Sequence, residues 1–343
     1  MGVNLGDLIE REEIDFADLN DKEIAVDAMN TLYQFLSIIR QRDGTPLKDS
    51  SGNITSHLSG LFYRNINMLE ENIRPVYVFD GEAPDLKEKE TTQRRKKREE
   101  AREEWKKLKE EGKVSEAYSK ATQSSKLTGD MIKESKRLLD AMGIPYIQAP
   151  SEGEAQAAYM THEDYPGDIY AVGSQDWDSL LFGAERMVKN LTTRKTRKTS
   201  SGGRKEISTE LIELEEVLDQ LDISQEKLIW MGVLMGTDFN PDGVHGIGPK
   251  TALKLVREYD SWDKLFEDEK VEWESEAGPE QIIDFFKSPP VEEIEYSFGE
   301  VDEEKIKEIL VDDHDFSEDR VESGLSDLEA ALSSRQSGLD SFT

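Results

Sequence analysis

Three segments of the chain are apolar on both faces and end in acidic residues. They read EIAVD, ending at Asp27, VYVFD, ending at Asp80, and IYAVGSQDWD, reaching Asp176 and Asp178. Strands that are hydrophobic on both faces are typical of a parallel sheet covered by helices. Ligands of such sheets bind outside the carboxyl ends of the strands. The pattern therefore predicts that acids from separate strands gather on one rim.

Segments with helical periodicity alternate with these strands. Apolar positions recur at helical spacing over 29–40, 56–73 and 131–144, and a further strand is predicted over 145–150. This alternation predicts an α/β fold with a mostly parallel central sheet flanked by helices. The length of 343 residues allows one large domain or two smaller ones.

Two basic stretches stand out. Residues 87–109 carry eleven basic and six acidic side chains and predict a helix that is polar all round. Residues 194–205 carry six basic and no acidic side chains, and their Ser, Gly and Thr content predicts a mobile loop. Phosphate is the obvious partner of both basic stretches.

A further candidate for phosphate binding lies in 228–260. Two predicted helices flank the turn GIGPK there, and the backbone amides of this turn are suited to a phosphate.

Composition narrows the class of protein. The chain has 43 Lys and Arg against 74 Asp and Glu, a formal charge of −31, which by itself argues against an ordinary nucleic-acid binder. Cys is absent, so a disulfide framework and a Cys-ligated zinc site are excluded, and no two of the four His have a zinc-type spacing. No signal-peptide pattern or bilayer-length apolar run is present, and we expect a cytoplasmic protein without membrane contact.

The acids form a candidate metal site. The members are Asp27, Asp80, Glu152, Glu154, Asp176, Asp178 and Asp238. Carboxylates without His or Cys favour hard cations such as Mg²⁺ or Mn²⁺. Two such ions, roughly 3.5–4 Å apart, activate a water and stabilise the leaving oxygen of a phosphodiester.

Several of these acids also have a local explanation. Ser151 and Glu154 fit the S-x-x-E capping box of a helix. Asp176 and Asp178 are placed to cap the helix that follows them, and Asp238 is suited to a turn. The two acids that end apolar strands are harder to explain locally. The joint placement of all seven favours metal binding.

Two basic residues and one aromatic residue are candidates for substrate contact. Lys87 and Arg94 are seven residues apart, which places them on one helix face. Beside the acids they would attract the scissile phosphate and stabilise transition-state charge, although a solvated basic face is the common alternative. Tyr33 follows Asp27 by six residues and is suited either to stacking on a base or to the core.

Together these segments resemble the flap endonuclease family in its archaeal form, within the structure-specific 5′-nuclease superfamily. The motifs are IAVDAMNTLYQFL, VFDG, SEGEAQAA and SQDWDSLLFG, and the resemblance covers nearly the whole chain. It implies a PIN-like 5′-nuclease core with a helical arch and a helix–two-turn–helix element. The implied activity is that of a Mg²⁺-dependent flap endonuclease and 5′ exonuclease, which cleaves 5′ flaps of branched DNA in replication and repair. A catalytically silent DNA-junction or clamp-binding module is the alternative.

The resemblance also implies residue roles. One Mg²⁺, or Mn²⁺ in its place, would be held by Asp80, Glu152 and Glu154 with help from Asp27, and the second by Asp176, Asp178 and Asp238. Lys87 and Arg94 match a catalytic pair at the base of the arch, and Tyr33 matches a base-stacking position. Duplex DNA, with a K⁺ ion, would be gripped by Gly246, Ile247, Gly248 and Lys250.

We expect a monomer with one nuclease domain over 1–330 and a flexible tail over 331–343. The parts of the domain are 1–84, the arch 85–130, the internal part 131–262 and an acidic helical part 263–330. In the tail, Gln336, Leu339 and Phe342 match the pattern that binds the sliding clamp (PCNA). Thr343 replaces a second aromatic residue, which predicts a weakened contact.

The acidic excess predicts a high-salt cytosol, as in a halophilic archaeon. Electrostatic interactions are screened within ~3 Å at 1 M salt. DNA recognition would then depend on close contacts, through metals, backbone amides, stacking and the two basic stretches.

Overall fold

The computed structural model describes residues 5–41, 43–87, 100, 103–105, 107–108, 126–192, 196–198, 204–267, 271–273, 275 and 277–340. Its centre is a seven-stranded sheet in the order β1-β9-β6-β5-β2-β3-β4. The strands are β1 (Glu12–Ile14), β2 (Glu23–Asp27), β3 (Arg74–Phe79), β4 (Tyr146–Gln148), β5 (Ile169–Gly173), β6 (Arg186–Lys189) and β9 (Thr209–Glu213). Strands β2 to β6 are parallel, and β9 runs antiparallel to β6 and to the edge strand β1. The predicted mostly parallel α/β sheet is confirmed.

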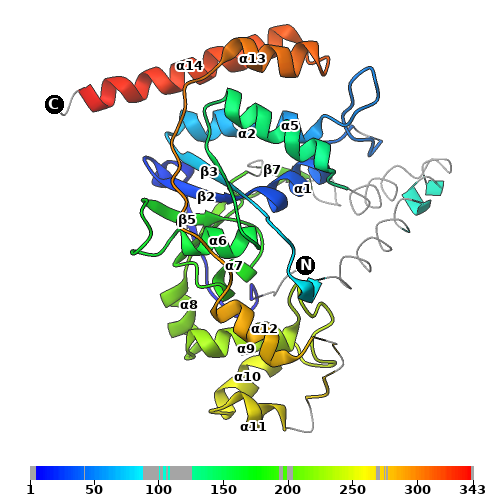
Figure 1. The fold of residues 1–343 in the computed structure, drawn as a ribbon, viewed down its shortest axis with the longest axis vertical. Helices are drawn as coiled ribbons and strands as arrows, with labels where there is room; N and C mark the ends of the chain where they lie inside the picture. Colours follow the sequence, from blue (N-terminus) through cyan, green and yellow to red (C-terminus); the bar gives the residue numbers. More distant parts are fainter. Residues whose placement is uncertain are drawn as a thin grey trace.

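Alternation along the central strands divides the interior into two cores. Ile24 and Val26 of β2 face one core, whereas Ala25 faces the other. The first face is covered by α1 (Ala28–Ile38), α2 (Ser56–Glu70) and α5 (Gly129–Ala141). The second is covered by α6 (Gly153–Tyr159), α7 (Asp178–Leu181), α9 (Gln225–Met235) and α12 (Pro279–Lys287), as Figure 1 shows.

A third layer lies on the outer side of α2 and α5. It consists of α13 (Glu303–Lys307), the π-helical turn η3 (Glu308–Asp312) and α14 (Glu318–Asp340) (Figure 1). Helix α14 approaches α2 closely at Gly324, where a Cβ atom would lie 2.7 Å from the Phe62 ring. At the opposite end of the molecule lie α8 (Leu214–Leu221), α10 (Pro249–Glu258) and α11 (Trp262–Phe266).

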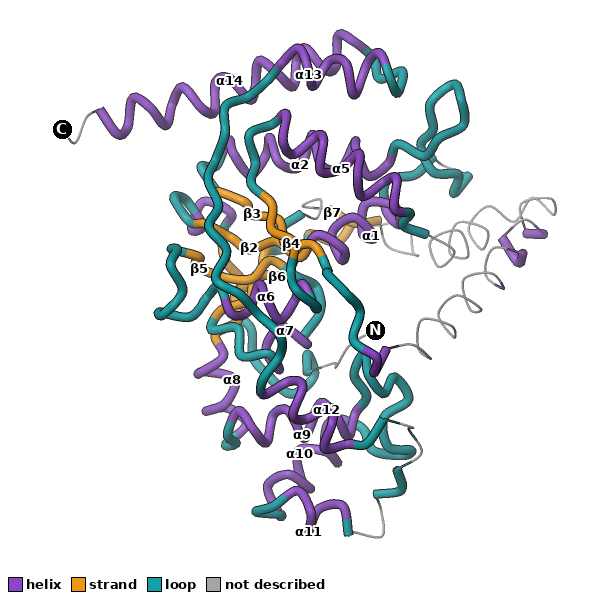
Figure 2. Tube along the Cα trace, in the orientation of Figure 1, coloured by secondary structure: helices purple, strands orange, loops and turns teal. Residues whose placement is uncertain are grey.

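An extended segment over 288–302, here called the strap, joins α12 to α13 (Figure 2). The Gly299 amide donates to the Gly143 carbonyl at 2.9 Å, and the Tyr296 hydroxyl donates to Glu23 Oε2 at 2.7 Å. Glu23 begins β2 and Gly143 precedes β4. The strap therefore crosses the amino ends of the parallel strands, at the edge opposite the acids.

Two segments that the sequence predicts to be irregular have regular secondary structure. In the basic stretch 194–205, β7 (Thr196–Lys198) and β8 (Arg204–Glu206) pair as an antiparallel hairpin, because two short strand-like runs flank the turn-forming SSGG. The tail predicted to be flexible from 331 is helical through Asp340, because it continues α14, whose buried residues recur at helical spacing. The arch over 85–130 lies largely outside the described residues, which include its first turn, η2 (Asp85–Lys87).

Across the described ranges, no helix is both long and apolar enough to cross a membrane.

Candidate metal centre

The candidate acids lie around one rim of the parallel sheet. Asp27 ends β2, Asp80 directly follows β3 and Asp176 follows β5. Helices contribute the remaining acids: Glu152 and Glu154 at the start of α6, Asp178 at the start of α7, and Asp238 after α9. Each of the seven lies close enough to another for the negative charges to raise a pKa. Strand direction therefore places Asp27, Asp80 and Asp176 on one rim, and the helices bring the other four acids to it.

Asp27 is held by hydrogen bonds from two residues on the rim. Its side chain is buried, with Oδ1 accepting from the Asn30 amide at 3.0 Å and Oδ2 from the Ser174 hydroxyl at 3.2 Å. Burial, and then the charge of Asp80, raise the pKa of Asp27 to about 7. A nearby cation would favour the charged form of this carboxylate at neutral pH.

Crowding also raises the pKa of other acids on the rim. Burial raises the pKa of Glu154 well above its usual value, and the charges of Asp176 and Asp27 raise it further. The pKa of Asp176 is raised by burial and by the charge of Asp238. Several carboxylates that repel one another in a small space form a site that favours positive charge.

Lys87 supplies one positive charge within the ring of acids. Its ammonium lies 2.5 Å from Glu152 Oε2, 3.4 Å from Asp238 Oδ2 and 5.3 Å from the centre of the Phe239 ring. Burial lowers the pKa of Lys87, but the charges of Glu152 and Asp238 outweigh burial, and the pKa is raised. Lys87 thus contacts one acid from each of the two predicted metal-binding sets.

The local explanation of Glu154 as part of a capping box is wrong. Glu152, not Ser151, is the N-cap of α6, and the Ser151 hydroxyl donates to the Glu82 carbonyl at 3.1 Å. The Gly153 amide at this helix start donates to Asp80 Oδ1 at 2.9 Å. The first amide of α6 is therefore capped by Asp80, the acid that follows β3, and not by Ser151.

The donor set fits a hard divalent cation. Its ligands are carboxylate oxygens, and burial disfavours their charged forms unless a cation is near. Among the described residues, no three acidic or histidine side chains close on a single point at metal-binding distance. Mg²⁺ bonds are about 2.0–2.1 Å long. Binding therefore requires side-chain movement, and Lys87 lies between acids from both predicted sets.

Lys189 was missed by sequence reasoning. It is the last residue of β6 and is buried, with its ammonium 4.0 Å from the centre of the Trp177 ring. Burial lowers the pKa of Lys189 to about 8, although the charge of Asp176 opposes this effect. The sequence carries one signal for this residue: the short apolar run RMVK ends in a lysine, as the predicted strands end in acids.

The structure places the predicted DNA contacts on separate elements. Tyr33 is half-buried on α1 and packs against the first core. In the turn before α10, Gly246 has a φ of +78°, Ile247 is buried, and Gly248 is the N-cap of the helix. Lys250 is exposed in the first turn of α10.

The remaining predicted contacts are only partly described. Gln336 and Leu339 lie in the last turns of α14, while Arg94 and Phe342 lie outside the described residues.

Comparison with known proteins assigns the chain first to a class of nucleases and then to one family within it. The family model of the XPG N-terminal domain matches residues 1–101, and that of the XPG I-region matches residues 143–238. The sheet and its acidic rim therefore belong to the 5′-nuclease superfamily. The flap endonuclease 1 of Pyrococcus horikoshii is 52% identical over 345 residues, covering 100% of this chain and 98% of that protein. The chain belongs to the flap endonuclease 1 family.

Solved structures agree with this assignment. Flap endonuclease-1 from Methanococcus jannaschii matches with a TM-score of 0.76 and 42% identity, over 97% of this chain and 100% of that chain. The catalytic core of Rad2 in complex with a DNA substrate matches with a TM-score of 0.66, over 93% of this chain and 96% of that chain. At 24% identity, the latter match shows likeness of fold.

Proposed function

We propose that this member of a family of structure-specific nucleases cleaves 5′ flaps of branched DNA in replication and repair, leaving a 5′-phosphate and a 3′-hydroxyl. The supporting observation is the set of seven acids around one rim, together with full-length likeness to flap endonuclease 1. A catalytically silent binding module is not favoured, because binding DNA does not require so many repelling carboxylates near phosphate.

Two Mg²⁺ ions, or Mn²⁺ in their place, would occupy the rim. The proposed ligand sets are Asp80, Glu152 and Glu154 with Asp27, and Asp176, Asp178 and Asp238. When bound, such ions activate a water and stabilise the leaving oxygen. Lys87, together with Arg94, would turn from its carboxylate partners to the scissile phosphate and offset charge in the transition state.

The test of this function is cleavage of a labelled double-flap DNA. We expect incision with Mg²⁺, none with EDTA, and little with a matched duplex that lacks the flap. Absence of cleavage by the wild-type protein across a wide range of KCl concentrations would end the enzyme proposal.

Replacing Lys87 by Met should tighten metal binding while it slows cleavage. The ammonium competes with a divalent ion for Glu152 and Asp238, so we expect roughly tenfold higher affinity for Mn²⁺ in the absence of DNA. Cleavage should fall by roughly 10²- to 10³-fold. Calorimetric titration with Mn²⁺ measures the first effect.

Lys189→Met is the matched control for this titration. It also removes a positive charge near the rim, but the Lys189 ammonium lies over Trp177 and not between the two acids. Equal changes in both variants would indicate a general field effect, and unchanged affinity in Lys87→Met would contradict competition.

DNA contact would extend from the rim to the turn before α10. The N-terminus of this helix, with exposed Gly246, Gly248 and Lys250, would grip the phosphates of the duplex, together with a K⁺ ion. Buried Ile247 anchors the turn to the core. Tyr33 would stack on a base beside the metals.

The C-terminal tail would bind the sliding clamp weakly, and the protein would act as a monomer. Gln336, Leu339 and Phe342 supply most of the clamp-binding pattern, but Thr343 lacks the aromatic ring that would fill the last position. Calorimetry with a 330–343 peptide and the clamp should give measurable but weak heat. Thr343→Phe should bind more tightly, and no heat from either peptide would rule out this contact.

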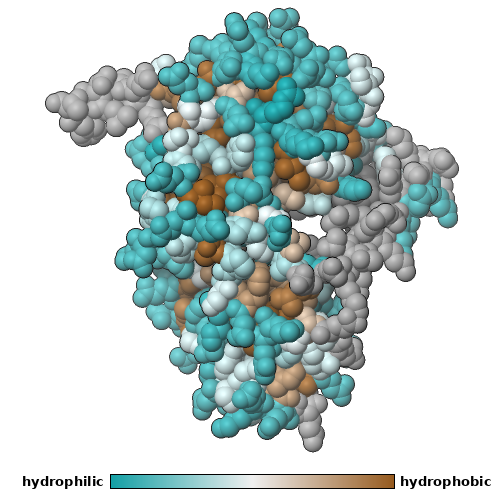
Figure 3. Space-filling model, viewed as in Figure 1, coloured by the Kyte–Doolittle hydropathy of each residue, from teal (hydrophilic) through white to brown (hydrophobic). Residues whose placement is uncertain are grey.

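The acidic surface would suit a cytosol with molar KCl. The chain carries a formal charge of −31, and hydrophilic residues dominate the face drawn in Figure 3. High salt screens the resulting repulsion between acids.

A further inference from the structure

Helix α6 carries two of the seven rim acids but is only seven residues long. Glu152 is its N-cap, and Glu154 lies in its first turn. Isolated helices shorter than about 12–15 residues are marginally stable in water, because the first turn is costly to form. The position of α6 on the sheet, and with it the position of both glutamates, therefore depends on contacts with the rest of the chain.

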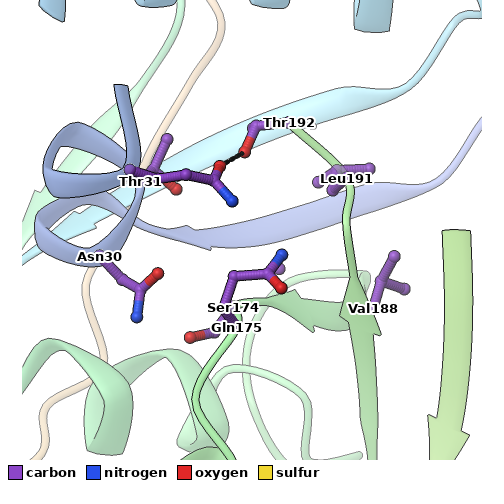
Figure 4. Close-up of a pocket in the computed structure, with 9 residues that line it drawn as sticks. Asn30, Thr31, Ser174, Gln175, Val188, Leu191 and Thr192 are labelled. Atoms are coloured by element: carbon purple, nitrogen blue, oxygen red, sulfur yellow. Dashed lines mark hydrogen bonds between the residues drawn. The ribbon is translucent and has the colours of Figure 1, made fainter. Parts of the chain in front are cut away.

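The acids that follow strands are held in a different way. The Ser174 hydroxyl, directly after β5, donates to Asp27 Oδ2 at 3.2 Å and accepts from the Asp176 amide at 3.1 Å. Figure 4 shows Ser174 at the end of β5 and Asn30 in the first turn of α1, and the Asn30 amide donates to Asp27 at 3.0 Å. These acids are fixed by bonds at the ends of the strands, whereas the two glutamates take their position from α6.

The strap holds α6 through Gln156, which lies one turn after Glu152. The Gln156 side chain is fully buried, with Nε2 donating to the Glu292 carbonyl at 2.8 Å and Oε1 accepting from the Glu292 amide at 3.0 Å. Both kinds of hydrogen-bonding group in the carboxamide are used, which fixes the orientation of this side chain. Helix α6 thus begins at the acidic rim and meets the strap in its second turn (Figure 2).

A second contact anchors the same strap without involving α6. The Tyr165 hydroxyl donates to the Ile294 carbonyl at 2.8 Å and accepts from the Ile294 amide at 3.4 Å. Tyr165 is buried in the loop between α6 and β5. Loss of this contact would loosen the strap but leave the bond between the strap and α6 in place.

We propose that Gln156 is a positioning residue for the metal centre. By fixing α6 against the strap, it sets the positions of Glu152 and Glu154 relative to the acids of the sheet. The inference rests on the metal-dependent function proposed above and adds a residue to it. Because Mg²⁺ requires near-ideal octahedral geometry, a small shift of a helix that carries two ligands costs affinity. An anchored helix limits the movement on metal binding to side chains.

Replacement of Gln156 by Met, an apolar side chain of similar size, tests the proposal. Calorimetric titration with Mn²⁺ in the absence of DNA should give a Kd about 3- to 10-fold higher than in the wild type. Tyr165→Phe is the matched control, since it removes the other strap contact; its Tm should also fall, but its Mn²⁺ affinity should not change. In cleavage assays, kcat of Gln156→Met should fall at limiting Mg²⁺ and recover at excess Mg²⁺, with KM for DNA unchanged.

A second variant leaves the sequence of α6 intact. Glu292→Pro removes the backbone amide that donates to Gln156, and Glu292→Ala is its control because the Glu292 side chain is exposed. We expect weaker Mn²⁺ binding in the proline variant alone. Wild-type affinity in both Gln156→Met and Glu292→Pro, or an equal loss in Tyr165→Phe, would overturn the positioning role.

The same titrations separate this role from the proposed function. If the variants lose Mn²⁺ affinity as expected but the wild-type protein does not cleave flap DNA, the proposed function is wrong and the positioning role stands. Absence of Mn²⁺ binding by the wild-type protein would overturn the positioning role together with the metal centre. Thermal unfolding verifies that each variant is folded at the temperature of the titration.

Discussion

Replacing Asp176 by Ala should reduce flap cleavage by at least about 10³-fold, a loss of about 4 kcal/mol of transition-state stabilisation. Asp176 follows β5 and lies near Glu154 and Asp238, whose charges interact with its own. Removing it takes away a proposed ligand of the second ion. Single-turnover cleavage of double-flap DNA at saturating Mg²⁺ measures the chemical step separately from product release.

Asp140→Ala is a matched control for this prediction. Asp140 is an acid of the same length, but it lies exposed near the end of α5, away from the rim. Its replacement should leave cleavage unchanged, and the same circular dichroism spectrum in both variants would verify folding. If Asp176→Ala retained more than about a tenth of wild-type activity, the assignment of the second metal site would be wrong.

Removal of salt should destabilise the folded chain. With 74 acidic against 43 basic side chains, self-repulsion is strong in dilute buffer and is screened in molar KCl. From 0.1 to 2 M KCl we expect the free energy of unfolding to rise by roughly 2–5 kcal/mol, or about 4–10 °C in Tm. Thermal unfolding followed by circular dichroism measures this change, and cleavage should persist above 1 M KCl.

A charge-removing variant separates repulsion from general salt effects. Glu303 in α13 has a raised pKa because its protonated form shares a hydrogen bond with its acidic neighbour Glu329 in α14, whose negative charge raises the pKa further. Glu329→Gln should therefore raise Tm in dilute buffer and have little effect in 2 M KCl. Full stability in dilute buffer together with unfolding at high salt would contradict adaptation to salt.

The sequence predicted the positions of Asp27 and Asp80 because local pattern determines them. Each follows a short strand that is apolar on both faces, and such strands form the centre of a covered parallel sheet. Once strand direction is known, the shared rim follows. The sheet order then brings the acids after β5 beside them.

The positions of Lys87 and Lys189 were not predictable in this way. A charge run indicates a solvated face, but Lys87 is half-buried between two acids that lie 65 and 151 residues further along the chain. Lys189 depends on Trp177 for its position. Such contacts depend on tertiary packing, which composition and periodicity do not specify.

The strap and the antiparallel edge were missed because their sequences are acidic and short. In the strap, Ile294, Tyr296 and Phe298 alternate with polar residues as in a strand, but the neighbouring glutamates and prolines resemble a loop. Strand β9 reads TELIE and β1 reads EEI, and their charged residues are not typical of strands. The antiparallel edge of the sheet forms because β9 pairs with β6, and not because its residues have a high strand propensity.

The contact between α2 and α14 determines the order in which the molecule is completed during synthesis. Gly324 approaches Phe62 and Ile66 from a point more than 250 residues later in the chain. The outer apolar side of α2 therefore stays uncovered until the ribosome has delivered most of α14. In the nascent chain this side of α2 is the surface available to chaperones or to other unfinished copies, and its burial marks the end of folding.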